Sequence, residues 1–173
     1  MKRFLKQCLV AGLGLALVAT PAFAQGGLMV GGGLTMPQGD FGDGVKSGVH
    51  GMVALDFGVL GAPLGVRVDG SYHLNYFDLP GDPDAAANII AVGGDVVYSF
   101  PSPGAHPYVL GGITWASLKC SGDDCLNDDS ESATGFNVGG GIRFGGIFAE
   151  AKYVSIGGDL DIKYVPITVG FHF

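Results

Sequence analysis

Apolar and polar residues alternate along most of the chain, and the alternation is clearest between residues 64 and 76. The even positions there are Leu, Val, Val, Gly, Tyr, Leu and Tyr, whereas the odd positions are Gly, Arg, Asp, Ser, His and Asn. Successive side chains of a β-strand point to opposite faces, so this period of two predicts a strand with one apolar and one polar face. The same pattern predicts eight strands, at residues 28–36, 47–58, 64–77, 89–100, 107–120, 135–144, 147–155 and 162–173.

The connections between the predicted strands differ in length and charge. Three are short and rich in Gly and Pro: residues 59–63, 101–106 and 145–146. Four are mostly longer: residues 37–46, 78–88, 121–134 and 156–161. The short connections carry no charged residue, whereas the longer ones hold most of the sixteen acidic residues. One short, uncharged end and one long, acidic end are typical of a transmembrane β-barrel, with short turns in the periplasm and long loops outside.

Charged residues on the predicted strands indicate which face points inward. Those on the polar face are Asp56, Arg67, Asp69, Asp95, Lys119, Arg143, Glu150 and Lys152. They are too few to cover the outside of a soluble barrel, but a small lumen accepts them when they are paired. We therefore expect Arg67, Arg143 and Lys152 to neutralise the acids inside the barrel. Lys163 lies off this face at a loop end, where a long side chain can reach the lipid headgroups.

Aromatic residues on the apolar face gather at the two ends of the strands. Near the short connections these are Phe57, Tyr98, Phe100, Tyr108, Phe144, Phe171 and Phe173, and near the long ones Tyr72, Tyr76 and Tyr153. Two aromatic girdles around an aliphatic band are expected where a barrel crosses the two membrane interfaces. The fold class is therefore all-β, a closed antiparallel up-and-down barrel of eight transmembrane strands.

Composition supports a membrane environment. Only 14% of the residues are charged and 47% are hydrophobic, whereas a soluble domain carries about 25% charged residues. The 32 glycines are also unusual for the length of the chain, and they suit a narrow interior.

Residues 1–24 have the three parts of a secretory signal peptide. Lys2, Arg3 and Lys6 precede the apolar run 9–19, and Ala22-Phe-Ala24 forms a cleavage site before Gln25. Cleavage between Ala24 and Gln25 leaves a barrel domain at residues 25–173. Removing three of the nine basic residues leaves six against sixteen acidic ones, a formal charge of about −10. This charge excludes a nucleic-acid partner.

The C-terminal segment 165–173 alternates, ends in Phe and is similar to the terminal strand signal by which outer-membrane barrels are recognised for assembly. That signal usually has a glycine where this chain has Thr168. The proline at position 166 is expected to mark a bulge, because it cannot donate to the ladder.

Together with the motifs Gly-Asp-Phe-Gly-Asp (39–43) and Pro-Tyr-Val-Leu-Gly-Gly (107–112), residues 26–173 resemble the small outer-membrane β-barrel domain family of the outer membrane protein A/X type. The resemblance implies the cell outer membrane as the location. It also implies outer-membrane lipid or lipopolysaccharide and the barrel-assembly machinery as partners, with Phe171 and Phe173 as the assembly signal.

Cys120 and Cys125 enclose the segment Ser-Gly-Asp-Asp in the longest connection. They are the only cysteines after residue 24, and an exported protein meets an oxidising environment, so we expect a disulfide that closes the loop. A zinc site would need two further soft ligands, and none is nearby in the sequence.

Asp69, Ser71 and His73 share one face of a predicted strand and have the residue types of a hydrolytic triad. Neighbours on one face are about 6.5–7 Å apart, too far for direct hydrogen bonds between all three. The His-x-Ser-Asn motif of small outer-membrane lipid A deacylases is also missing, so we expect interior hydrogen bonds rather than an enzyme.

The acidic loops contain no calcium-loop motif, and no cofactor is expected. They are expected to form a solvated, repulsive surface, although loose bridging by divalent cations to lipopolysaccharide phosphates is the alternative.

The sequence thus predicts an integral outer-membrane barrel with a structural or surface-interaction role, a side-chain-filled lumen and acidic extracellular loops. A small porin-like passive channel is the main alternative, and a lipid-modifying enzyme is less favoured. Eight-stranded barrels are normally filled by side chains, which places the channel second.

Overall fold

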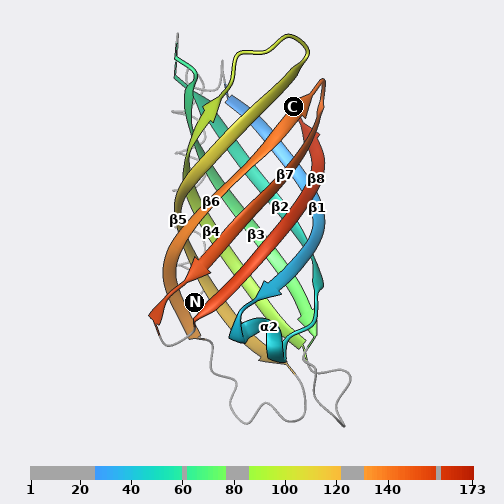
Figure 1. The fold of residues 1–173 in the computed structure, drawn as a ribbon, viewed down its shortest axis with the longest axis vertical. Helices are drawn as coiled ribbons and strands as arrows, with labels where there is room; N and C mark the ends of the chain where they lie inside the picture. The colour runs from blue at the N-terminus through green and yellow to red at the C-terminus, as the bar shows by residue number, and fades with distance from the viewer. Residues whose placement is uncertain (1–25, 60–61, 77–85, 122–130, 159–160) are drawn as a thin grey trace, which may run out of the picture.

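The computed structural model describes residues 26–173 except 60–61, 77–85, 122–130 and 159–160. Each strand pairs antiparallel with its sequence neighbour, and the last strand pairs with the first, which closes the barrel (Figure 1). The strands are β1 (Gly26–Gln38), β2 (Gly48–Gly58), β3 (Leu64–Tyr76), β4 (Ala86–Ser99), β5 (Ala105–Ser121), β6 (Glu131–Phe144), β7 (Ile147–Ile156) and β8 (Ile162–His172). The predicted eight-stranded, closed, up-and-down barrel is confirmed, and its strand ends move by only a few residues.

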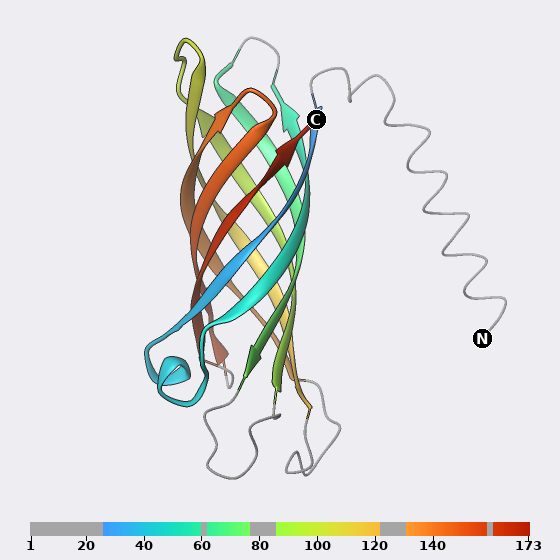
Figure 2. The same cartoon turned by 90° about the vertical axis from the view of Figure 1, so that its right-hand side faces the viewer.

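The two ends of the barrel differ in the way the sequence predicts. The short connections 59–63, 100–104 and 145–146 lie at one end, beside the start of β1 and the end of β8. At the other end a short helix, α2 (Asp40–Gly44), joins β1 to β2 and is visible in Figure 2 at the bottom of the barrel. The sequence pattern does not predict this helix, which follows a turn at Gly39 with a positive φ of 60°. In the described ranges, no helix has the length and apolar character needed to cross a membrane.

Side-chain burial follows the period of two along the strands. In β3, for example, Arg67, Asp69 and His73 are buried, whereas Val66 and Val68 are each 49% exposed. The outer wall is thus mostly apolar, and most of the charged side chains on the strands point into the barrel. An apolar exterior of this extent marks a surface that contacts lipid rather than water.

Apolar side chains close the lumen around the buried charges. At the α2 end, Phe41 packs against a cluster of Ile89, Ala91, Ala116, Val154, Ile156, Ile162 and Tyr164. Two smaller clusters lie farther along the strands: Met29, Met52, Ala54 and Phe148, and Val97, Tyr108 and Leu110. On β7, Glu150 and Lys152 stand between Phe148 of one cluster and Val154 of another. The ions are therefore enclosed by apolar layers.

Inward-facing glycines make room for the large polar side chains. A Cβ added at Gly141 would lie 2.5 Å from the Tyr108 hydroxyl, and one added at Gly93 would lie 2.9 Å from Asp69 Oδ1. Both distances are shorter than a normal contact, so only glycine leaves these side chains in place. The abundance of glycine on the polar face thus follows from the packing of a narrow lumen.

Pro166 interrupts the pairing of β7 and β8 but does not produce the expected bulge. The register is the same on both sides of the gap, with Ala151 opposite Ile167 and Val154 opposite Tyr164. No extra residue is inserted, so the bulge prediction is wrong. The missing N–H of proline costs the local ladder contact, and its buried ring packs inside the barrel instead.

Candidate functional site

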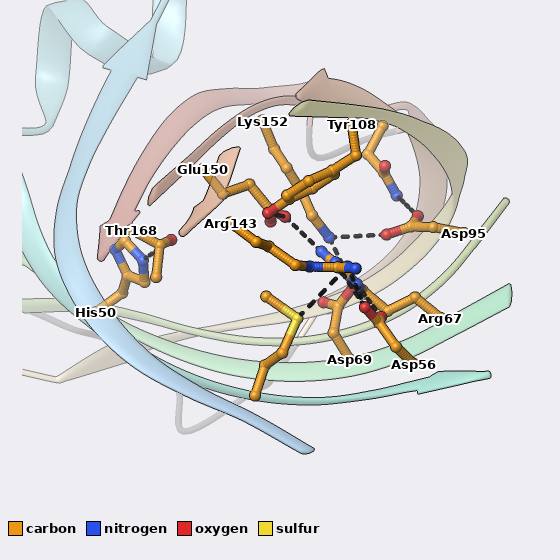
Figure 3. Close-up of polar contacts among 12 residues, drawn as sticks. His50, Asp56, Arg67, Asp69, Asp95, Tyr108, Arg143, Glu150, Lys152 and Thr168 are labelled. Carbon is orange, nitrogen blue, oxygen red and sulfur yellow. Dashed lines mark hydrogen bonds and ion pairs between the residues drawn. The ribbon is translucent and has the colours of Figure 1, made fainter. Parts of the chain in front are cut away.

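The barrel interior holds the densest group of chemically active side chains, and Arg67 lies at its centre (Figure 3). Arg67 is completely buried and donates to Asp56 through Nε at 2.6 Å and Nη2 at 3.2 Å. Its Nη1 donates to Glu150. Asp56 also accepts a hydrogen bond from Arg143, so two arginines share this carboxylate. A guanidinium forms such two-pronged bonds well because its donors lie in one rigid plane.

Lys152 forms the second ionic group of the lumen. Its Nζ lies 2.6 Å from Asp69 Oδ1 and 2.9 Å from Asp95 Oδ2. The other oxygen of Asp95 accepts a hydrogen bond from Asn137 at 2.8 Å. Asn137 also donates to Thr114, at 2.9 Å. Each buried carboxylate in this group therefore has a charged partner, as burial of an ion requires.

Tyr108 connects the ionic groups to the apolar layer beside them. Its hydroxyl donates to Glu150 at 2.7 Å, and its ring lies 4.5 Å from the Cζ of Arg143 and 5.2 Å from that of Arg67. Two guanidinium groups on one aromatic ring form cation–π contacts, which gain strength when water is excluded. Tyr108 thus fixes the positions of both arginines.

A chain of neutral hydrogen bonds runs beside the ions. Thr35 Oγ1 lies 2.7 Å from Nδ1 of His73 and 3.1 Å from Nδ1 of His50. The other ring nitrogens bond to Ser71 at 2.9 Å and to Thr168 at 2.8 Å. A threonine hydroxyl carries a single proton, so it can donate to only one of the two rings. All four ring nitrogens are therefore engaged.

A small cavity of about 20 Å³ separates the histidine chain from the ionic group of Lys152. His50, His73, Ser71, Asp69 and Lys152 are among the residues that line it. One water molecule needs roughly 10–15 Å³ measured in this way, so the space admits a water but no larger ligand. The interior thus resembles a packed core more than a binding pocket.

The structure brings together seven of the eight charged residues that the sequence places in the lumen: Asp56, Arg67, Asp69, Asp95, Arg143, Glu150 and Lys152. Lys119 is the exception. It is exposed and shares the outward face of β5 with Ile113 and Trp115, so the lumen prediction is wrong for this residue. Near the strand end a lysine can extend its charge into the headgroups, and its polarity alone does not fix the face.

The prediction for Tyr108, which lies on the same strand, is also wrong. The sequence pattern predicts that Tyr108 lies in the outer aromatic girdle, but it is only 2% exposed and faces the lumen. There its hydroxyl donates a hydrogen bond to Glu150, and its ring contacts the guanidinium groups of Arg67 and Arg143. The two outward C-terminal aromatics are as expected, with Phe171 60% exposed and Phe173 73% exposed.

The Asp69, Ser71 and His73 arrangement is not a triad. Ser71 does reach His73, at 2.9 Å, a direct contact that strand spacing alone does not suggest. Asp69 bonds to Lys152 instead of orienting the imidazole, so the acid needed by a hydrolytic base is already engaged. The described residues also contain no group of three His, Cys, Asp or Glu side chains that could hold a metal ion.

Several predicted features lie outside the described residues. These are the signal peptide with its cleavage site at Ala24 and Gln25, the Cys120 and Cys125 side chains, and most of the acidic loop residues. Further interior residues were not predicted from the sequence, namely Thr35, His50, Tyr108, Asn137, Tyr164 and Thr168. Most of these are polar residues at inward positions, and the period of two could have identified them, but their partners depend on the barrel stagger.

A family model described as outer membrane protein beta-barrel domain matches residues 9–173. Among solved structures, Neisserial surface protein A is similar with a TM-score of 0.70 and 14% identity, over 85% of this chain and 95% of that one. The attachment invasion locus protein of Yersinia pestis is similar at 0.52 and 17%, over 86% and 99%. The outer membrane enzyme PagL is similar at 0.51 and 14%, over 86% and 98%. No curated protein sequence matches the chain. These structural likenesses show the fold alone.

Proposed function

The chain belongs to the outer membrane β-barrel domain family, and from this premise we propose that it is a non-conducting barrel that stabilises the outer membrane and presents its acidic loops to the surroundings. Its place in the outer membrane follows from the family and the fold. The role in membrane structure and surface interaction is our proposal. Short turns face the periplasm and long connections face outward in such barrels, and we assign the same orientation here.

The observation that carries the proposal is the filled lumen. Three cations and four acids cross the interior in paired groups, and Phe41 with its apolar cluster closes the α2 end. An ion moving through this barrel would have to displace side chains that are bound to one another and would lose its own hydration. Both requirements oppose conduction.

Single-channel recording in planar bilayers tests this proposal. We expect refolded protein to insert without producing uniform conductance steps, while a general porin does so in the same bilayers. Repeated steps of one size from the pure protein would contradict the non-conducting lumen.

A small passive channel is the second candidate, and the short-turn end favours it. A vestibule of about 250 Å³ opens there and is lined in part by Asp56, Arg143 and His172. A channel would need the ion pair of Arg143 and Asp56 to separate so that the vestibule extends inward. The bilayer recording described above distinguishes the two candidates.

We also propose that the chain has no enzymatic activity. Asp69 is engaged by Lys152, and the hydroxyl of Ser71 lies inside the barrel wall, where a lipid ester cannot reach it. Refolded protein incubated with lipopolysaccharide or phospholipid vesicles is expected to release no fatty acid. Release that disappears in a Ser71→Ala variant would overturn this proposal.

A further inference from the structure

The outward wall over β1 to β4 contains an open groove of about 550 Å³. The backbone at Gly51 and Gly70 forms part of its floor, and Val30, Val53 and Tyr72 are among its walls. This volume lies in the range of small-molecule sites. Because the groove is on the membrane-facing side of the barrel, its natural occupant is a lipid rather than a water-soluble ligand.

Two glycines create the depth of the groove. A Cβ added at Gly51 would meet only the carbonyl oxygen of Gly31, at 4.0 Å, and one added at Gly70 only that of Ala91, also at 4.0 Å. The protein itself therefore leaves room for a side chain at both positions. Glycine in a strand interior weakens the strand and marks a place where another molecule can approach the backbone.

Tyr72 connects the groove to a polar group at the end of the barrel near α2. Its hydroxyl donates to Oδ1 of Asn88 at 3.3 Å, and Asn88 is the cross-strand partner of Lys119. Directly opposed residues have Cβ atoms about 4.5–5.5 Å apart. A phenol, an amide and an ammonium group thus stand on the outward faces of three adjacent strands, within reach of one headgroup.

The charge of the outer wall favours an anionic headgroup. At outward-facing positions of the described strands the charged residues are Lys119 and Lys163, both near the long connections. Lys163 is bound to Asp161 at 2.8 Å. Lys119 is exposed and forms no ion pair with any residue that the structure describes. In a chain with a formal charge of −7, a lysine on the lipid-facing wall suits a phosphate.

We propose that the groove and the Tyr72, Asn88 and Lys119 group form one binding site for a phosphorylated lipid. An acyl chain lies over Gly51 and Gly70, and the phosphate lies against Lys119. The site belongs to the outer leaflet, an assignment that rests on the orientation given in the proposed function. Tyrosine at the interface and lysine in the headgroup region are the positions these residues prefer in membranes.

The chain contains a reporter for this site. Trp115 is its one tryptophan, is 44% exposed on the outward face of β5, and is paired with Val92, which lines the groove. A lipid with brominated acyl chains seated in the groove would therefore quench the fluorescence of Trp115.

The test uses protein refolded into phosphatidylcholine vesicles that contain increasing amounts of brominated lipid. Brominated phosphatidic acid is compared with brominated phosphatidylcholine, so that only the headgroup differs. We expect brominated phosphatidic acid to quench Trp115 at a mole fraction roughly fivefold lower than brominated phosphatidylcholine. This is the preference for an anionic lipid that one lysine near a membrane surface provides. Lys119→Gln should abolish this preference, and the matched control Lys163→Gln should retain it.

Filling the groove tests the acyl-chain half of the site. The double variant Gly51→Leu, Gly70→Leu is expected to lose the preference, and Gly70→Leu alone serves if the double variant does not fold. Gly94→Leu is the matched control, because a Cβ at Gly94 has nothing within 4 Å, so a side chain fits there too, and this residue does not line the groove. The ratio of the two lipids is compared in each variant, which cancels general shielding of Trp115.

Equal quenching by the two lipids in the wild type would overturn the site. So would a preference that survives filling of the groove, or one that Lys163→Gln lowers as much as Lys119→Gln. In a symmetric vesicle the result does not depend on which end of the barrel faces outward. Failure of the lipid site therefore leaves the proposed function intact, and ion conductance would overturn the proposed function alone.

Discussion

Replacing Arg67 with methionine removes the centre of the interior network. Arg67 is completely buried and is the partner of both Asp56 and Glu150. After the substitution, Asp56 keeps only Arg143, and Glu150 keeps only the hydroxyl of Tyr108. Methionine fills much of the space of the arginine stem, so the main effect is loss of charge compensation rather than a cavity.

The expected cost follows from the burial of the remaining acids. Breaking a buried ion pair by removing one partner destabilises a protein by about 3–5 kcal/mol. Arg143→Met is the matched comparison, because the Arg143 side chain is 18% exposed and Asp56 would keep both of its bonds to Arg67. Loss of this more accessible bond should cost about 1–2 kcal/mol. The two substitutions remove the same charge from the same network, so their difference isolates the effect of burial.

The measurement is reversible urea unfolding of protein refolded into thin lipid vesicles, followed by the fluorescence of Trp115. The free energy of unfolding should fall in the order wild type, Arg143→Met, Arg67→Met. Adding Glu150→Gln to Arg67→Met should recover part of the loss, because an amide does not leave a buried charge. Equal stability of the two single variants, or a cost below about 1 kcal/mol for Arg67→Met, would refute the buried network.

Three further predictions concern topology, assembly and the longest loop. Labelling of intact cells with a membrane-impermeant biotin reagent or a protease should reach segments 78–88 and 121–134 and spare 59–63 and 101–106, and the opposite result would invert the orientation. Deleting Phe173 should sharply lower the amount of protein in the outer membrane while purified protein still refolds, because burying one Phe contributes only about 1.5–3 kcal/mol; a comparable loss of refolding in vitro would make the residue structural. Cys120 and Cys125 should resist alkylation until a reductant is added, and free thiols in protein purified from cells would contradict the disulfide.

The fold could be predicted because a barrel in a membrane repeats one simple constraint on every strand. A strand such as β3 has an unmistakable polar face, with Arg67, Asp69 and His73 at alternate positions. Because lipid surrounds the barrel and the lumen is narrow, the polar face has to point inward. The set of lumen charges was therefore predictable almost in full, and so was their neutralisation by one another.

The face of β5 could not be chosen from its sequence. Its outward positions include Ile113 and Trp115 together with Lys119, and its inward positions include Tyr108 and Leu110 together with Thr114. Both faces thus carry apolar as well as polar residues. Because Lys119 is charged, the sequence pattern predicted its face to be the inward one, which is wrong. The inward choice of Tyr108 depends on Glu150 and Arg143, which belong to other strands. Such contacts depend on the stagger between the strands of the closed barrel, which the sequence of a single strand does not predict.

In this barrel the polar face of each strand fills the lumen, while the apolar face contacts lipid. Spin labels attached one at a time along residues 64–76 test it most directly, in a background where Cys120 and Cys125 are serine. Accessibility to oxygen, which concentrates in lipid, should rise at every even position and fall at every odd one, and a water-soluble nickel chelate should reach neither set in the middle of the strand. Loss of the period of two, or high oxygen accessibility at positions 67, 69 and 73, would show that the polar face does not fill the lumen.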